Sequence, residues 1–313
     1  MRHKRCLVIL VVSVLVLAAS LVGHAYPQRP ITLVCPYGVG GGTDIVARVL
    51  ARHMEESLGV PVVVENKVGA GGAVGFSYTA QANPDGYNIV LVALPIVTLP
   101  VFQDVKITHN DLRPIGLVNG DAAAIIVRAN SPWQTLEDLI EAGHSRQLRI
   151  GTTSPGAAWW IGAQILKQQT GIQGVDIPYA AGAAPMLTAL AGGEIEVATC
   201  SAAEATSMLE SGEVRILAVM SEERLPFFPD IPTCKEEGYD VTFSTWRGIM
   251  APKDTPDDIA AVLEEAVKEA AHTEAFRKFL YDNKYGFEYL NPKEFKDFMD
   301  AQFAIFTEIK EDL

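Results

Sequence analysis

The chain has 313 residues, of which 49% are apolar and 20% are charged. This composition excludes a disordered or fibrous protein, and the length suits two domains of ordinary size. The formal net charge of −13 is the opposite of what a phosphate backbone attracts, so the charge argues against nucleic-acid binding.

Residues 1–25 have the pattern of a cleaved export signal. A basic start precedes the apolar run 7–17, and Gly23 and Ala25 supply the small residues of a signal-peptidase site. We expect cleavage after Ala25 and a mature protein in the periplasm, the alternative being a permanent N-terminal anchor. Cleavage removes three basic and no acidic residues, which leaves 22 basic against 38 acidic residues and a net charge of −16.

The mature chain alternates short β-rich runs with helical stretches. A first strand is predicted at 31–35 and a helix at 44–58, whose apolar residues recur at helical spacing and which ends at Gly59 and Pro61. Further strands are predicted at 62–65, 88–92, 124–127, 148–151, 175–177, 195–199 and 215–220. Strands separated by helices predict an α/β protein with mostly parallel sheets flanked by helices, in which ligands bind beyond the carboxyl ends of the strands.

Two amphipathic helices are predicted near the C-terminus. The first begins after Thr255 and Pro256 and has an apolar stripe within 259–270. The second begins after Pro292 and has a largely aromatic stripe that we assign to the core, namely Phe295, Phe298, Met299, Phe303 and Ile305.

The cysteines and histidines show no pattern typical of a disulfide framework or a metal site. Three cysteines without short spacing remain in the mature chain: Cys35, Cys200 and Cys234. One disulfide between two of them is left as an alternative. The four histidines outside the signal lack metal-ligand spacing, and the chain has neither a G-x-S-x-G nor an H-E-x-x-H motif. We therefore expect no metal, no cofactor and no catalytic residue.

Four glycines connect the first strand to its helix. The segment consists of Tyr37, Gly38, Val39, Gly40, Gly41, Gly42, Thr43 and Asp44. Its backbone amides and the positive end of the helix dipole predict an anion pocket. It lacks the lysine of a phosphate loop and the third glycine of the dinucleotide fingerprint. The alternative is a glycine turn in which Thr43 or Asp44 caps the helix.

Two further loops have related compositions. A second glycine cluster, 69–75, we interpret as a tight loop that lets a helix pack closely. The strand at 148–151 is followed by Thr153, Ser154, Pro155, Gly156, Ala157, Ala158, Trp159 and Trp160. This segment predicts a second nest of donors that faces the first if two domains close on one another. Because neighbouring helical residues point about 100° apart, we expect at most one of the two tryptophans to line the site.

Several motifs in order resemble the substrate-binding proteins of the tripartite tricarboxylate transporters, the Bug receptors. The matching segments are 26–31, 34–37, 40–44, 47–48, 62–67, 69–72, 83–87, 177–179, 190–193, 217–219, 228–233, 246–248 and 251–252. The resemblance covers essentially the whole mature chain.

The resemblance implies a two-domain periplasmic-binding-protein architecture of the Venus-flytrap kind, type II. It places the first domain at 26–124 plus 246–313 and an inserted second domain at 125–245. Family ligands are mostly small carboxylates or amides held between two strand-to-helix loops, which correspond here to 38–44 and 153–158. The implied partners are a small carboxylate and the membrane permease subunits of such a transporter; we expect a monomer and no nucleic acid.

We place five further residues at the ligand site: Tyr179, Ser201, Glu204, Trp246 and Arg247. The guanidinium of Arg247 suits a carboxylate, and the alternative is that it forms an inter-domain ion pair. The family's second loop commonly has a Gly-Ser pair and a histidine, whereas this chain has alanines and tryptophans at 157–160, and 93–96 is also more apolar than expected. Both departures favour a monocarboxylate with an apolar or aromatic body over citrate.

Two other functions stay open. The same receptor could report its ligand to a signalling partner instead of a permease. An exported hydrolase or isomerase could use the same cleft with Asp44 or Glu204 as its base, although no base and nucleophile occur together in the sequence.

Overall fold

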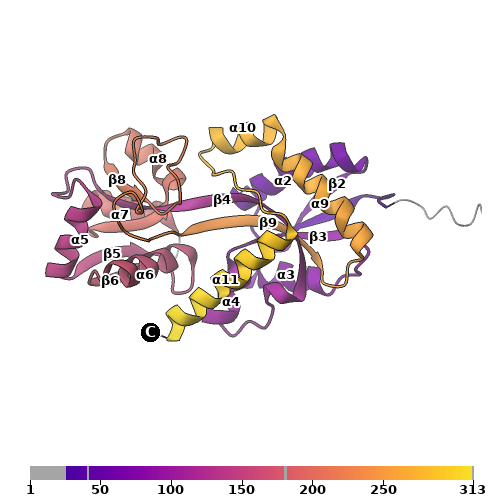
Figure 1. Ribbon diagram of the computed structural model, residues 1–313, viewed down its shortest axis with the longest axis horizontal. Helices are drawn as coiled ribbons and strands as arrows, with labels where there is room; N and C mark the ends of the chain where they lie inside the picture. The colour runs from indigo at the N-terminus through magenta and orange to yellow at the C-terminus, as the bar shows by residue number, and fades with distance from the viewer. Residues whose placement is uncertain (1–25, 41, 180–181, 312–313) are drawn as a thin grey trace, which may run out of the picture.

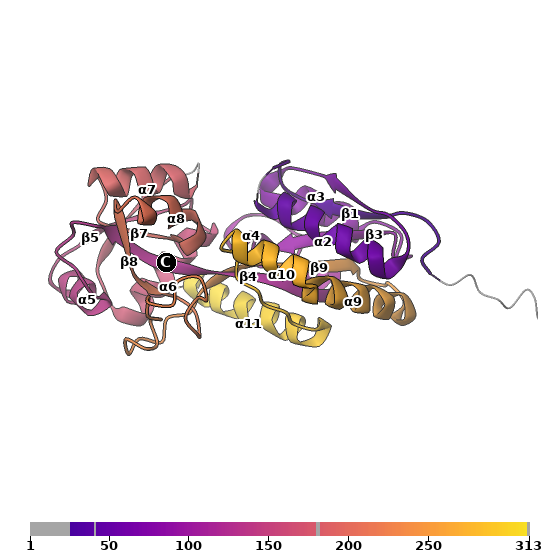
Figure 2. The ribbon, with the colours of Figure 1, turned by 90° about the horizontal axis from the view of Figure 1, so that it is seen from above.

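The computed structural model describes residues 26–40, 42–179 and 182–311. The predicted export signal and Gly41 lie outside these ranges. Figure 1 shows two lobes along the long axis of the molecule, and Figure 2 confirms that β4 (Leu112–Arg128) and β9 (Ser244–Pro252) run between them. This is the two-domain α/β architecture that the sequence predicts.

The first lobe is a sheet with helices on both faces. Its strands are β1 (Ile31–Cys35), β2 (Val62–Asn66), β3 (Asn88–Ala93), β9 and the first part of β4, in the order β2-β1-β3-β9-β4. One face is covered by α2 (Gly42–Leu58) and α9 (Asp257–His272), and the other by α3 (Ala73–Ala80), α4 (Pro95–Phe102) and α11 (Pro292–Glu311). The remaining elements are η1 (Ala70–Gly72), η2 (His109–Asp111) and α10 (Glu274–Asp282).

The second lobe continues the sheet from the far part of β4. Its strands are β5 (Leu148–Thr152), β6 (Gly174–Pro178), β7 (Val197–Ser201) and β8 (Val214–Val219), in the order β4-β7-β5-β6 with β8 also paired to β4. Its helices are α5 (Leu136–Ser145), α6 (Ala158–Thr170), α7 (Ala183–Gly192) and α8 (Ala202–Glu210).

The strand β4 belongs to both lobes. It pairs with β9 from Leu112 to Ala122, and from Ala123 onward it pairs with β7 and β8. All pairs made by β4 and β9 are antiparallel, whereas the β1–β2, β1–β3, β5–β6 and β5–β7 pairs are parallel. The sheet is therefore more mixed than the expected mostly parallel one, because these two long strands cross between the lobes in opposite directions.

Buried apolar side chains explain why the helices form where they do. In α2 the buried residues Val46, Leu50, Met54 and Leu58 recur at four-residue spacing and pack against the first-lobe sheet. The glycine cluster 69–75 packs as expected, since an added Cβ at Gly75 would lie 2.9 Å from Pro36. The three cysteines of the mature chain are all buried and free.

The buried face of α11 differs in part from the apolar stripe that the sequence predicts. Phe295 and Met299 are buried as expected, but Ile305 is 47% exposed, and Phe306 and Ile309 are buried in its place. Ile305 lies six positions after Met299, which puts it off the three-to-four-residue spacing of one helix face.

Candidate functional site

The glycine loop between β1 and α2 is open to solvent. Gly38, Val39 and Gly40 are exposed, and Gly40 has a φ of +79°, a left-handed conformation that favours glycine. A Cβ added to Gly42 would lie 2.8 Å from the hydroxyl oxygen of Tyr285. Glycine at this position therefore lets the start of α2 approach Tyr285 closely.

Asp44 is buried and holds the loop in shape. Its carboxylate accepts hydrogen bonds from the Gly40 amide (2.9 Å), Arg48 Nε (2.9 Å) and Asn66 Nδ2 (2.7 Å). Burial alone would raise the pKa of Asp44, but these hydrogen bonds lower it to about 2. Because so acidic a carboxyl group is a poor base, the geometry argues against a hydrolase that uses Asp44.

Tyr37 lies beneath the same loop. Its carbonyl oxygen accepts a hydrogen bond from Asn66 Nδ2 (2.9 Å), and its hydroxyl is buried without a hydrogen-bond partner among the residues described. Burial raises the pKa of Tyr37, and the charge of Arg247 opposes this rise. The structure thus makes Tyr37 a support of the loop instead of exposing its hydroxyl.

Arg247, on β9, is held by hydrogen bonds from three directions. Its Nη1 donates to Asp121 Oδ2 (2.7 Å) and to Asn119 Oδ1, and its Nε donates to Thr43 Oγ1 (3.1 Å). Asp121 and Arg247 are 4% and 13% exposed, so water screens their ion pair only weakly. Within 26–40, 42–179 and 182–311, Nη2 has no partner, which leaves donors of a fixed guanidinium available.

The residues 283–291, here named the strap, fix this arrangement from the other edge of β4. The Gly286 amide donates to Asp121 Oδ1 (3.0 Å), and the Gly286 carbonyl accepts from Asn119 Nδ2 (2.6 Å). The ring of Tyr285 faces the guanidinium of Arg247 at 5.4 Å. Thr43, Asn119, Asp121, Arg247 and Tyr285 form one unit, which we name the polar cluster.

The loop after β5 is less rich in free donors than expected. Thr153 Oγ1 accepts from the Trp160 amide (3.3 Å), and the Ala157 amide donates to the Ser154 carbonyl (2.9 Å). Gly156 has a φ of +79° and packs against Phe102 of the first lobe. A Cβ added to Gly156 would lie only 2.6 Å from the Cβ of Phe102. α6 begins at Ala158 without a side-chain cap and without an acidic residue in its first turn.

The predicted nest on the second lobe therefore includes the amides at the start of α6. The N–H groups of Ala158 and Trp159 have no hydrogen-bond partner in the described part of the chain. They lie at the positive end of the α6 dipole, which attracts an anion. Pro155 is exposed beside them and Ser154 is half-buried.

The two tryptophans have different neighbours. Trp160 packs edge-on against Phe102 across the lobes, with ring centroids 5.4 Å apart. Trp159 is 8% exposed, its carbonyl accepts from Thr199 Oγ1 (2.7 Å), and its side chain interacts with the carboxyl group of Glu204. Trp159 is thus the tryptophan directed toward other predicted site residues.

Ser201 and Glu204 form the N-terminal cap of α8. Ser201 Oγ accepts from the Ala203 amide (3.1 Å) and Glu204 Oε2 accepts from the Ser201 amide (3.3 Å). Part of the Glu204 side chain is exposed to solvent, and protein surrounds the rest of its carboxyl group. Desolvation, together with the nearby Asp121 carboxylate, raises the pKa of Glu204 to about 7, although the Ser201 amide, Arg247 and Trp159 lower it.

Two predicted residues lie apart from these groups. Trp246 is fully buried: its Nε1 donates to Gln302 Oε1 (2.7 Å) and its ring packs on Phe295. Successive strand residues point to opposite faces, so Trp246 points away from the face that bears Arg247. Tyr179 directly follows β6, which is an edge strand of the sheet, and desolvation and Glu194 raise its pKa. No described contact joins it to Arg247 or Glu204.

Sequence reasoning missed Asn119, Asp121 and Tyr285. Asn119 and Asp121 are almost fully buried within β4, whose other residues in this stretch are mainly apolar. Their pattern could have revealed them: two polar residues two positions apart in an apolar strand share one face of it, and a buried charge normally has a partner. Tyr285 lies in an irregular segment and gives no such signal.

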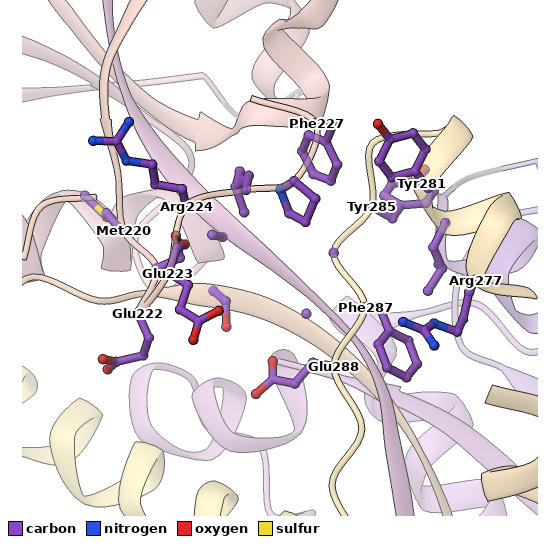
Figure 3. Close-up of a pocket in the computed structure, with 18 of the residues that line it drawn as sticks. Met220, Glu222, Glu223, Arg224, Phe227, Arg277, Tyr281, Tyr285, Phe287 and Glu288 are labelled. Atoms are coloured by element: carbon purple, nitrogen blue, oxygen red, sulfur yellow. Dashed lines mark hydrogen bonds between the residues drawn. The ribbon is translucent and has the colours of Figure 1, made fainter. Parts of the chain in front are cut away.

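A cavity of about 1200 Å³ lies between the lobes on the other face of β4 and β9. It is lined by residues 220–227 and 242–244 on one side and by α10, the strap, Phe298 and Gln302 on the other. Figure 3 shows the carboxylates of Glu223 and Glu288 directed into it, with Phe227 near Tyr281. None of the described residues predicted to bind the ligand lines this cavity.

The polar cluster suits a carboxylate better than this cavity does. Glu223 and Glu288 have no ion-pair partner in the described ranges. Of the cations that line the cavity, Arg224 is paired with Glu236 and Lys278 with Asp282, each at 2.8 Å, so that only Arg277, whose guanidinium lies over the ring of Phe287, is unpaired in those ranges. Two unpaired carboxylates repel an anion, whereas the polar cluster and α6 offer free donors. Within the described residues no group of three or more His, Cys, Asp or Glu could hold a metal ion.

A two-lobed α/β fold with donors at a strand-to-helix loop of each lobe is typical of a solute-binding protein. Residues 46–312 match the family described as "Tripartite tricarboxylate transporter family receptor". The chain belongs to this family. Receptors of the family bind solutes and are in general not enzymes. No helix in the described ranges is long and apolar enough to cross a membrane.

Solved structures agree with this assignment. A TctC solute-binding protein from Polaromonas without ligand is 38% identical, with a TM-score of 0.85 over 92% of this chain and 100% of that one. MatC from Rhodopseudomonas palustris, with bound malate, is 25% identical, with a TM-score of 0.71 over 91% and 100%. Rpa4515 from R. palustris, with adipate, is 26% identical, with a TM-score of 0.74 over 91% and 97%.

Proposed function

We propose that this protein is a periplasmic receptor that binds a small carboxylate between its lobes and delivers it to a tripartite tricarboxylate-type permease. The observation that carries the proposal is the fixed Arg247, whose Nη2 has no partner among the described residues while Asp121, Asn119 and Thr43 occupy its other donors. The relatives with malate and adipate support a carboxylate as the ligand class.

The ligand contacts come from both lobes in this proposal. The first lobe supplies Arg247 and the amides of Gly38, Val39, Gly42 and Thr43, since the Gly40 amide is taken by Asp44, and the second lobe supplies the amides of Ala158 and Trp159 at the start of α6. The change of β4 partners after Ala122 supports a division into 26–124 plus 246–313 and an inserted domain, 125–245. Closure is driven by the ligand, because the contacts from both lobes exist together only around it.

Local donors, not the overall charge, hold the carboxylate. The mature chain would carry a net charge of −16, which opposes long-range attraction of an anion. Salt screens that field over about 8–10 Å, whereas a guanidinium and helix amides act at contact distance. The apolar residues at 157–160 and 93–96 favour a monocarboxylate with an apolar or aromatic body.

A binding screen with matched arginine variants tests the function. The mature chain is titrated calorimetrically with malate, adipate, citrate, phenylacetate and branched-chain acids. Arg247→Lys keeps the charge beside Asp121 but removes the planar fork, so it should weaken carboxylate binding at least tenfold. Arg224→Lys, at the rim of the cavity, is the matched control and should bind as the wild type does. Absence of binding by every carboxylate would overturn the proposal.

Uptake experiments test delivery to a permease. Spheroplasts that contain the cognate membrane proteins should accumulate a radiolabelled ligand only when the mature receptor is added. Equal uptake without the receptor would overturn delivery to a permease, and the protein would then bind its ligand for another purpose, such as sensing.

A further inference from the structure

The charges around the candidate site do not balance. Asp121 neutralises Arg247 at 2.7 Å, so this pair contributes little net charge. Glu204 adds a further carboxyl group on the second lobe, where no cation is paired with it among the described residues. A ligand that is only an anion would therefore bring its charge next to an unneutralised acid.

Glu204 is held in place by its own helix. It occupies the third position of α8, where its Oε2 bonds the Ser201 amide and its carboxylate faces the positive end of that helix. Its other neighbours are Trp159 on α6, Asp121 on β4 and Arg247 on β9, with the phenol of Tyr285 on the strap and the buried thiol of Cys200 on β7.

We propose that Glu204 makes the site dipolar, so that it selects carboxylates that also carry a hydrogen-bond donor, a positively charged amine above all. The inference rests on the proposed function and narrows its ligand class. The carboxylate of such a ligand takes the Arg247 Nη2 and the α6 amides, and its amine takes the exposed carboxylate of Glu204.

The arrangement has a consequence for pH. An ammonium group binds the ionised form of Glu204, so binding releases a proton, and affinity rises as pH increases through about 7. A carboxylate without an amine is bound better when Glu204 is neutral, so its affinity falls over the same range.

Matched ligand pairs, measured on the wild type and two variants, test this selectivity. Phenylalanine is compared with 3-phenylpropionate, and leucine with 4-methylpentanoate, by calorimetry at pH 6 and pH 8. At pH 8 the wild type should bind the amine-bearing member at least tenfold more tightly. In Glu204→Gln, which can still cap α8, this ratio should fall close to one. Glu223→Gln, an exposed carboxylate in the cavity behind β4, is the control and should keep the wild-type ratio.

The outcomes separate the two proposals. Tight binding of the amine-free acids without preference for their partners overturns the role of Glu204 but leaves the carboxylate receptor intact. Preference for amine-bearing ligands that persists in Glu204→Gln also overturns it, because another group must then supply the acceptor. If no carboxylate of any kind binds, the proposed function fails together with this inference.

Discussion

The two faces of the β4–β9 crossing have opposite chemistry. One face bears Asn119, Asp121 and Arg247 in the polar cluster, and the other bears Gly120 and Trp246, which adjoin the apolar core and the cavity. Side chains alternate between faces along a strand, so residues adjacent in sequence serve different purposes. A single pair of long strands thus both joins the lobes and separates the polar cluster from the packing behind it.

The two faces also differ in how their residues depend on one another. On the polar face, each group satisfies the charge or hydrogen bonds of the next, and the loss of one leaves others unpaired. On the opposite face, residues contribute mainly through contact area. Substitutions on the two faces should therefore separate stability from binding.

The largest effect is expected for Arg247→Gln. It leaves the carboxylate of Asp121 buried without a cation, which should lower the free energy of unfolding by about 3–5 kcal/mol. The double variant with Asp121→Asn should recover most of that loss, since no unpaired charge remains. Both variants should fail to bind carboxylates. Urea denaturation measures the stabilities, and near-additive losses would contradict the coupling.

A smaller effect is expected on the opposite face for Trp246→Phe. The phenyl ring fills most of the same space but leaves Gln302 without its donor, which should cost about 1–3 kcal/mol. Ligand affinity should stay within twofold of the wild type, because the side chain points away from Arg247. A tenfold loss of ligand affinity, measured by calorimetry, would show that the two faces are not independent.

Local patterns predicted most of the fold. β1 occurs over the expected residues, 31–35, and α2 ends at Leu58 as expected, since both depend on short-range periodicity. The long β4 was recognised only at 124–127. Asn119, Gly120 and Asp121 interrupt its apolar pattern, and their place in the sheet depends on β9 and the strap, more than a hundred residues later.

The candidate site was predictable to a similar extent. The glycine loop and Arg247 were recognisable from residue type, and the structure places Thr43 of that loop 3.1 Å from Arg247. Whether Arg247 meets a ligand or an ion-pair partner could not be decided, because Asp121 faces it only through the β4–β9 register. Trp246 was expected at the site but faces the core, because neighbouring residues of a strand point to opposite faces.

A third test concerns the inter-lobe contact behind the crossing. Phe227 of the second lobe packs edge-on against Tyr281 of α10, with ring centroids 6.3 Å apart. A double-mutant cycle of Phe227→Ala and Tyr281→Ala should give a coupling of about 0.5–1.5 kcal/mol, the usual value for an aromatic pair. Strict additivity of the two losses in urea denaturation would show that this contact does not hold the lobes in solution.

The smallest effect is expected from the pH dependence of stability at Glu204. Its pKa is about 7 in the folded protein against about 4.3 in an unfolded chain, so the folded state retains a proton that the unfolded state releases. Stability is therefore undiminished below about pH 4 and falls as pH rises toward 7. Glu204→Gln removes this loss and should raise Tm at pH 8 by up to about 2 °C while leaving Tm at pH 4 unchanged. A lower Tm for the variant at pH 8 would mean that the ionised carboxylate stabilises the empty receptor. The surroundings of Glu204 would then favour its ionised form even when no amine is bound.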